Sequence, residues 1–296
     1  MTSAKDQLYA HLADGSTSVC QAWRVVRLDG TVYGFTDHDQ DLSFDGVTYR
    51  ASTGMTARAL QKSLGMAVDN SEAIGALSAS AITEADLIAG RFDGAVVQSW
   101  LVNWANPAER VQQFQGSFGE IQRGAGAFRA ELRGLTEDLN RPQGLVYQKQ
   151  CSAVLGDGRC RFDLAQPGFA VEVPLVERLD VGTYRLTALP SITDNWFERG
   201  RMVFLSGPAQ GLIALVRSDK TVDGDRIIEV FGDVGAVPGV GDMLRLEAGC
   251  DKIAATCREK FNNFINFRGF PDLPGEDWLT SYPVSSQVNN GGSLVR

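Results

Sequence analysis

Short runs of alternating apolar and polar residues, separated by turns, predict a mainly β chain. From about Val19 onward these runs have the length of strands, and glycine or aspartate stands at the joints between them. The stretch CQAWRVVRLDGTVYGFTDHD is typical of a hairpin that turns at Asp29-Gly30. LSFDGVTYRAS repeats this pattern at Asp45-Gly46, so the first half of the chain is expected to begin with two hairpins.

The rest of the first half contains two short helices and further strands by the same reasoning. Residues 4–13 place their apolar residues on one side of a helix, and Thr83–Ala89 predicts a second helix with Thr83 as its N-cap. The segment around residues 52–72 is less regular. A strand is expected over Ala95–Trp104, followed by a third hairpin in VQQFQGSFGEIQRGAGAFRAELRGL.

A break in the pattern divides the chain into two parts. In RPQGLVYQKQ, Pro142 and Gly144 interrupt both helix and strand patterns. Between Arg161 and Glu247 strand-length runs resume, which predicts a small antiparallel barrel or sandwich. We therefore expect two small β domains, over residues 1–140 and 141–296. These runs are FAVEVPLVERL, TYRLTAL, RMVFLSG, GLIALVRSD and RIIEVFG.

One helix is expected after the second set of strands. The segment DKIAATCREKFNNFINF has apolar residues at helical spacing, and Pro271 and Pro274 are expected to end it. The tail that follows to Arg296 is polar and expected to be extended. The residues on the apolar face of this helix are Ile253, Cys257, Phe261 and Phe264.

Composition and charge exclude several classes of protein. The chain has 296 residues and a formal net charge of −8, which argues against a protein that coats nucleic acid. No apolar stretch approaches the ~20 residues that cross a bilayer, so no membrane span is expected. The start lacks a signal-peptide pattern, which predicts synthesis in the cytoplasm with reduced thiols. His11 and His38 are the only histidines, so a histidine-rich metal centre is excluded.

Four of the five cysteines form two pairs, one on each side of the expected barrel. Eight residues separate Cys151 from Cys160, and six separate Cys250 from Cys257. Buried thiols are one interpretation, because free cysteine often packs as a small apolar residue. Structural zinc is a second, although zinc sites favour gaps of about two to four residues within a pair. An iron–sulfur cluster held by four thiolates fits the wider gaps better, because its metal atoms stand at several corners.

The sequence around these cysteines suits thiolates. Gly249-Cys250 is expected at the start of the helix, where exposed N–H groups and the helix dipole lower a thiol pKa. Gly156 and Gly158 have no side chains, so they leave backbone groups near Cys151 and Cys160 uncovered. The fifth cysteine, Cys20, has no partner in sequence and is expected to be a core or strand thiol. Basic residues that can offset the charge of thiolates are Arg159, Arg161, Lys252 and Arg258.

The cysteine motifs resemble those of a known protein family. QCSAVLGDGRCRFD, followed by GCDKIAATCREKFNNFINFRGFPDLPGED, is similar to the C-terminal region of phage tail-tip and baseplate hub proteins. This family includes the minor tail protein L of lambda-like phages and the hub proteins of gene transfer agents. GFTDHDQDLSFDGVTYRAS resembles the opening domain of the gene-transfer-agent and prophage branch. Together these matches span most of the chain.

The resemblance implies a structural protein and not an enzyme. It implies a [4Fe–4S] cluster held by Cys151, Cys160, Cys250 and Cys257, and a homotrimer at the tip of a virion-like tail. Its implied partners are the distal tail ring, the tip or fibre proteins and the cell-wall peptidase of the tail. DNA would only pass through the channel, and separately the net charge of −8 is compatible with an acidic lumen that repels it.

Other chemistry has weaker support. Asp37, His38, Asp39 and Asp41 resemble a divalent-cation site, but one histidine and its neighbouring carboxylates do not make a complete site, and a polar hairpin corner is the favoured interpretation. No phosphate-binding loop and no GxSxG motif occurs. An iron–sulfur redox protein or electron carrier remains the main alternative, and a peptidoglycan hydrolase is a third. Phe261, Phe264 and Phe267 are expected to be core residues that cover the cysteines from solvent.

Overall fold

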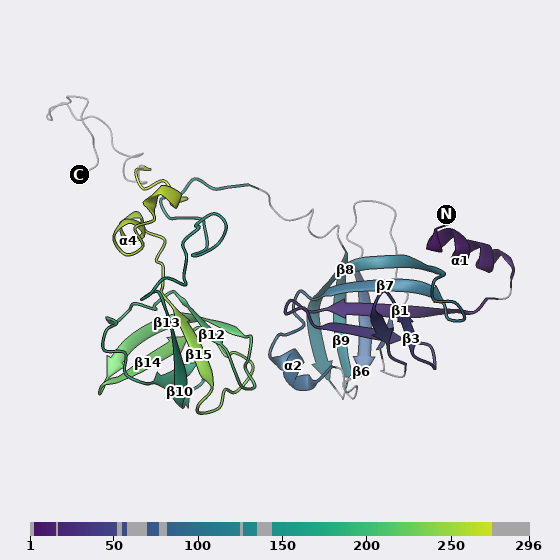
Figure 1. Ribbon diagram of the computed structural model, residues 1–296, viewed down its shortest axis with the longest axis horizontal. Coiled ribbons are helices and arrows are strands. Elements are labelled where there is room, and N and C mark those ends of the chain that lie inside the picture. Colours follow the sequence, from purple (N-terminus) through teal and green to yellow (C-terminus); the bar gives the residue numbers. More distant parts are fainter. Residues whose placement is uncertain are drawn as a thin grey trace, which may run out of the picture. The chain divides into compact units, whose positions relative to one another are not determined.

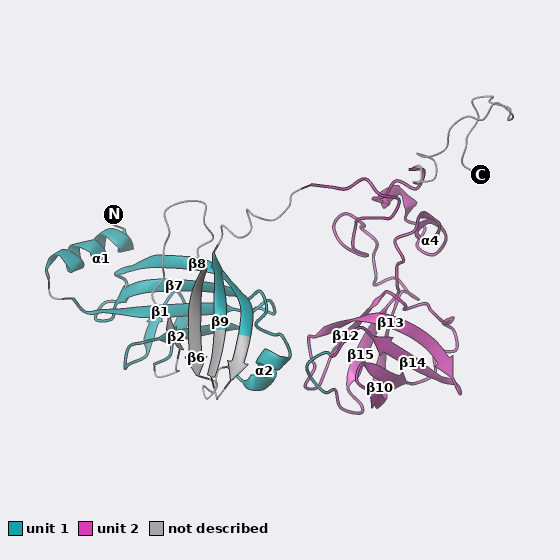
Figure 2. Cartoon of the chain, turned by 180° about the vertical axis from the view of Figure 1, so that it is seen from behind, with its two compact units in different colours: residues 1–142, 234–237 teal, residues 143–233, 238–296 magenta. Residues whose placement is uncertain are grey.

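The computed structural model describes residues 3–15, 17–51, 55–57, 70–76, 82–124, 127–134 and 144–273. These residues confirm a mainly β protein with a few short helices (Figure 1). The chain divides into two compact units, residues 1–142 with 234–237 and residues 143–233 with 238–296 (Figure 2). None of the described helices is long and apolar enough to cross a bilayer.

Unit 1 is built on one antiparallel sheet. Its strand order is β2-β1-β7-β8-β9-β6-β5, and β3 and β4 form a separate hairpin. The hairpins predicted at Asp29-Gly30 and Asp45-Gly46 are confirmed as β1–β2 and β3–β4. The strands are β1 (Val19–Val26), β2 (Val32–Thr36), β3 (Leu42–Phe44), β4 (Val47–Tyr49), β5 (Met55–Ala57), β6 (Asn70–Ala76), β7 (Val96–Asn103), β8 (Arg110–Gly124) and β9 (Ala127–Gly134).

The two predicted helices of unit 1 are also confirmed. The first, α1 (Ala4–Ala13), is capped by Ser3 and buries Leu8. The second, α2 (Glu84–Ile88), has Thr83 as N-cap, whose side chain accepts a hydrogen bond from the N–H of Asp86. Strands β5 and β6 fall within or next to the segment of residues 52–72, for which the pattern predicted no strand.

Side chains of β1 point alternately to the two faces of the sheet, and they contribute to a hydrophobic core on each face. Trp23 and Val25 pack in a cluster that also contains Leu87 of α2. Cys20 and Ala22 belong to a second cluster, which includes residues of the β3–β4 hairpin. Cys20 is therefore the strand thiol that its position predicted, and its Sγ lies 3.7 Å from the carbonyl oxygen of Val102.

Unit 2 contains a closed six-stranded barrel in the order β10-β11-β14-β13-β12-β15. Alternate residues point inward, and apolar ones such as Tyr184, Phe204 and Leu244 are fully buried. This confirms the barrel expected between Arg161 and Glu247. Its strands are β10 (Ala170–Asp180), β11 (Thr183–Leu186), β12 (Arg201–Phe204), β13 (Ile213–Val222), β14 (Asp225–Val230) and β15 (Met243–Glu247).

The prediction of one long helix over DKIAATCREKFNNFINF is wrong, because the helix in this segment is much shorter. The structure has α4 (Ala254–Glu259) and a separate 3-10 turn, η1 (Phe264–Asn266). Before the helix, Lys252 has a φ of 69°, and after it Asn262 has a φ of 45°. Both values are left-handed and incompatible with a continuous α-helix. The extended tail predicted after Pro274 lies outside the described residues.

Candidate metal centre

The four paired cysteines come together at one end of the barrel. Cys151 and Cys160 lie in the segment that leads into β10, Cys250 follows β15, and Cys257 lies in α4. All four line one narrow cavity, whose wall also includes Phe261 and Phe267. Figure 1 shows α4 beside this segment, at one end of the barrel strands. Residues separated by the whole barrel in sequence therefore share one site.

A single carboxylate organises the loop between Cys151 and Cys160. Asp157 accepts hydrogen bonds from the N–H groups of Val154 and Arg159, each at 2.9 Å, and from that of Cys160 at 2.6 Å. The N–H groups of Cys160 and Val154 lower the pKa of Asp157, so it stays ionised at neutral pH. One carboxylate thereby holds the turn between Val154 and Cys160.

Backbone hydrogen bonds join the two cysteine pairs. The N–H of Cys151 donates to the carbonyl of Lys252 at 2.9 Å, and the N–H of Ser152 donates to that of Arg268 at 3.1 Å. The N–H of Phe270 donates to the carbonyl of Gln148 at 2.9 Å. The segment before the barrel is thus paired with the segment after it on both sides of Cys151.

Backbone donors also point at the sulfur atoms. The N–H of Arg268 donates to the Sγ of Cys151 at 3.3 Å. The N–H of Lys252 donates to Cys250 and favours its thiolate. Hydrogen bonds to ligand sulfurs are a feature of iron–sulfur sites, where they help set the reduction potential.

Cys257 is buried, the other three thiols are half-buried, and the four are close enough to influence one another. Burial, and after it the charges of Cys250, Cys151 and Cys160, raise the pKa of Cys257 to about 11. Burial also raises the pKa of Cys250, which is not at the start of a helix. The expected lowering of this pKa by the helix dipole is therefore wrong. Holding these groups as thiolates requires nearby positive charge, which a bound metal supplies.

The four thiols are a donor set that a metal centre could use. In the described part of the chain, no three His, Cys, Asp or Glu side chains are arranged to hold one metal ion. The four thiols nevertheless surround a single cavity. A cluster with metal at several corners accepts sulfur ligands set wider apart than a mononuclear zinc site does. Thiolates are also the ligands that iron–sulfur clusters use.

Comparison with known proteins places the chain in a family. A family model described as "Baseplate hub protein, N-terminal attachment domain" matches residues 5–163, which is more than half of the chain. The chain belongs to the phage baseplate hub protein family. The resemblance expected from the motifs is thus confirmed. A second model, "Phage conserved hypothetical protein BR0599", matches residues 195–277 of this hub protein.

A solved structure is similar over almost the full length of the hub protein. The structure is titled "Virion of native gene transfer agent (GTA) particle", and one of its chains is 55% identical, with a TM-score of 0.91. The alignment covers 98% of this chain and 99% of that chain. A search of curated proteins found no match.

An aromatic core supports the cysteine site of the hub protein from the barrel side. Phe162, Leu164, Ala248 and Phe261 form a buried cluster, and Cys160 and Cys250 pack against it. Phe261 and Phe267 therefore cover the cavity as expected, whereas Phe264 does not line it and is 38% exposed. Cys160 and Cys250 therefore pack against a buried apolar cluster.

Lys260 was not identified from the sequence but holds the backbone beside Cys250. Its ammonium group donates to the carbonyls of Trp196 at 2.7 Å and Gly249 at 2.9 Å, and lies over the Trp196 ring. Burial lowers the pKa of Lys260. A Cβ on Gly249 would lie 1.6 Å from the carbonyl oxygen of Glu198, so this backbone approach requires glycine.

The alternative cation site in unit 1 has a simpler explanation. Asp37 accepts a hydrogen bond from the N–H of Gln21, and Asp41 accepts one from the N–H of Ala51, both at 2.7 Å. The His38 ring stacks on Trp104. These carboxylates cap backbone groups, as the polar-corner interpretation predicts.

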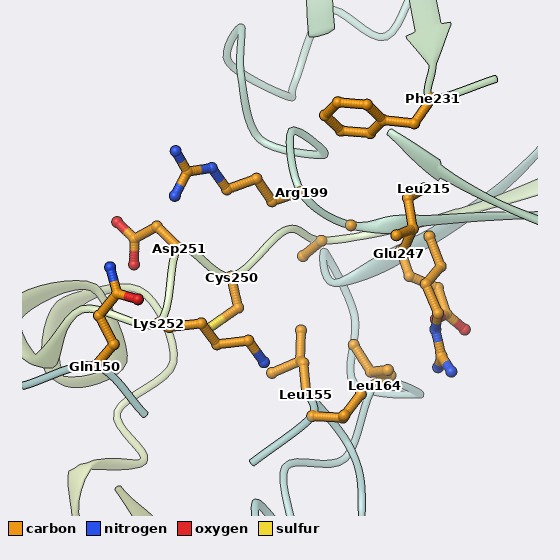
Figure 3. A pocket seen from close by; sticks show the side chains of 14 residues that line it. Gln150, Leu155, Leu164, Arg199, Leu215, Phe231, Glu247, Cys250, Asp251 and Lys252 are labelled. Carbon is orange, nitrogen blue, oxygen red and sulfur yellow. The ribbon is translucent and has the colours of Figure 1, made fainter. Parts of the chain in front are cut away.

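A second cavity borders Cys250 on the side of the barrel (Figure 3). Its volume is about 420 Å³. Leu155, Leu164 and Phe231 give it an apolar lining, and the charged side chains of Arg199 and Asp251 also line it. Cys250 lines both cavities.

Gly269→Ala is expected to disrupt the pairing that directs Arg268 toward Cys151. A Cβ at this position would lie 2.6 Å from the backbone of Gln150, which cannot move aside as a flexible side chain would. Overpacking of this kind costs about 1–3 kcal/mol. Hydrogen exchange in residues 148–152 should therefore become roughly 5- to 150-fold faster.

Gly158→Ala is the matched control for this change. Its added Cβ would meet nothing within 4 Å, although Gly158 lies in the same cysteine region. Exchange at the wild-type rate in both variants would contradict the close approach at Gly269.

Proposed function

We propose that this chain is the baseplate hub of a gene-transfer-agent-like tail, in which its four paired cysteines hold a [4Fe–4S] cluster. The similarity at 55% identity over 98% of the chain to a protein of a gene transfer agent virion supports the assignment to such a particle. We propose that the hub is a homotrimer that joins the distal tail ring to the tip proteins and the cell-wall peptidase. DNA passes through its channel only in transit.

The convergence of the four cysteines on one cavity is the observation that carries the cluster assignment. A bound cluster supplies a covalent link between segments that the barrel separates in sequence. Cys151 and Cys160 would anchor the segment that enters the barrel, and Cys250 and Cys257 the segment that leaves it. Because an unfolded chain has no preformed site, the binding free energy of such a group stabilises the fold.

Exposed apolar residues near the cysteines support a role in assembly. Leu145, Val146 and Tyr147 precede Cys151 and are all more than 70% exposed. The ring of Tyr147 lies 4.8 Å from that of Phe270, and Ile265 is 88% exposed. Large apolar side chains gathered at a surface mark contact with partner chains. We expect these residues to be covered in the assembled baseplate.

Cys160→Ser is expected to remove the cluster. The wild-type protein, purified without oxygen, should be brown and contain iron and acid-labile sulfide. The serine variant should lose most of both, because it supplies only three of the four thiolates. Cys20→Ser is the matched control, since Cys20 lies in the core of unit 1 and should leave the iron content unchanged.

Two further results separate the parts of this proposal. Wild-type protein that contains zinc and no sulfide would overturn the cluster, but not the hub assignment. Particles assembled with Cys160→Ser should have incomplete tips in electron micrographs, and normal tips would show that the cluster is dispensable. Reversible reduction that passes electrons to a partner would favour the redox alternative.

A further inference from the structure

A buried asparagine connects the two cysteine pairs. Asn263 lies between α4 and η1, is 9% exposed and lines the cysteine cavity. Its side-chain Nδ2 donates to the carbonyl oxygen of Cys160 at 2.8 Å and lies 3.5 Å from the Sγ of the same cysteine. Its backbone N–H donates to the carbonyl of Cys257 at 3.0 Å. One residue thus contacts both halves of the site.

The orientation of this amide is fixed from both ends. Nδ2 faces a carbonyl oxygen, which can only accept, so a donor is required there. Oδ1 accepts a hydrogen bond from the Nδ2 of Asn266 at 2.7 Å. The N–H of Asn266 in turn donates to the carbonyl of Asn263 at 3.0 Å. An amide held in this way presents N–H, and not oxygen, to Cys160.

Resting on the proposed cluster, we propose that Asn263 is a positioning residue that fixes the thiolate of Cys160 and tunes the bound group through its N–H. Arg268 and Lys252 supply backbone N–H groups to Cys151 and Cys250, and these donors survive most substitutions. Asn263 supplies the corresponding donor from a side chain. Donors of this kind stabilise negative charge on the sulfurs, and so favour the reduced state.

Asn263→Asp tests this inference with little change in shape. The carboxylate cannot donate to Cys160, and it places negative charge next to the sulfur. We expect the reduction potential to fall and a chelator to remove iron roughly 10- to 100-fold faster than from the wild type. Redox titration and the rate of iron release measure these effects without any assay of activity.

Gln150→Glu is the matched control for charge. Gln150 is exposed and adjacent to Cys151, so the same amide-to-acid change adds charge near the site without removing a donor to sulfur. This variant should shift the potential less and leave iron release close to the wild-type rate. An equal effect in both variants would assign the change to charge alone, and would overturn a role for the hydrogen bond.

Asn266→Ala keeps the inference testable if Asn263→Asp does not fold. It removes the donor to the Oδ1 of Asn263 and leaves the Nδ2 in place, so a smaller shift of the same sign is expected. If the wild type contains iron and sulfide but no Asn263 or Asn266 variant differs from it, the inference alone is overturned. A wild type without iron and sulfide would overturn the proposed cluster and this inference with it.

Discussion

Replacing Arg226 by methionine is expected to destabilise the barrel by roughly 3–5 kcal/mol, because it leaves a buried carboxylate without its partner. Arg226 of β14 is 1% exposed and pairs with Asp219 of β13, which is fully buried. The guanidinium also donates to the carbonyls of Ile192 at 3.0 Å and Thr193 at 2.7 Å. Besides its bonds to Arg226, the carboxylate of Asp219 accepts a hydrogen bond from the N–H of Phe197 at 2.8 Å.

The effect should extend from the barrel to the cysteine site. Arg226 and Asp219 hold the loop of residues 192–197, and the carbonyl of Trp196 in that loop accepts hydrogen bonds from Gly249 and Lys260. Hydrogen exchange detected by mass spectrometry measures the amide exchange rates of the barrel strands separately from those of unit 1. Exchange in β13 and β14 should accelerate more than about 100-fold, and the loop should follow.

Arg217→Met is the matched control for Arg226→Met. Arg217 lies on β13 and pairs with Glu229 of β14 at 3.0 Å, but its side chain is 60% exposed. A surface pair of this kind contributes about 0–1 kcal/mol. Adding Asp219→Asn to Arg226→Met should recover part of the loss, because it removes the unpaired charge. Equal effects of Arg226→Met and Arg217→Met would contradict the importance of burial.

Removal of iron from the proposed cluster is expected to loosen the outer part of the cysteine region and leave the barrel folded. Structural metal sites in small peptides contribute about 10–16 kcal/mol to folding. Residues 144–155 and 263–273 bury few apolar side chains, so they depend most on the cysteine site. Their amide exchange should accelerate by several orders of magnitude, while strands β10 to β15 change less than about tenfold.

The aromatic core should limit how far this loosening spreads. Phe162 and Phe261 are buried against each other, and Lys260 remains bonded to Trp196. Treating Cys160→Ser with the same chelator should produce no further change, since that variant already lacks the cluster. Unchanged exchange in residues 144–155 after complete loss of iron would show that the cluster does not hold this region.

The fold was predictable where a local signal coincided with a tertiary partner. Asp29-Gly30 and Asp45-Gly46 lie between apolar runs that do pair, so local turn chemistry and the sheet agree. Strand β15 carried a weak signal, because Met243–Glu247 is short and follows a loop rich in glycine, yet it pairs with β10 and β12 to close the barrel. Such pairing between distant segments is not encoded in a local pattern.

The cysteines of the candidate site were predictable from the sequence, and their surroundings were not. The spacing of the cysteines singled out the four that line the cavity. The helix around Cys257 was overextended because apolar periodicity continues through Phe264, whereas Asp251 takes hydrogen bonds from Ile253 and Thr256 that delay the start of the helix. The contacts of Lys260 and Asn263 depend on the barrel and on Cys160, so no local pattern reveals them.

The order of the four cysteines along the chain determines when each pair becomes available during synthesis. Cys160 and Cys257 are 97 positions apart, and the whole barrel lies between them. At about 5–20 residues per second, a ribosome completes the second pair roughly 5–20 s after the first. The last barrel strand ends at Glu247, so the complete set of four cysteines exists only after all six barrel strands have been synthesised. Metal held by all four cysteines would therefore mark a polypeptide in which every barrel strand is present.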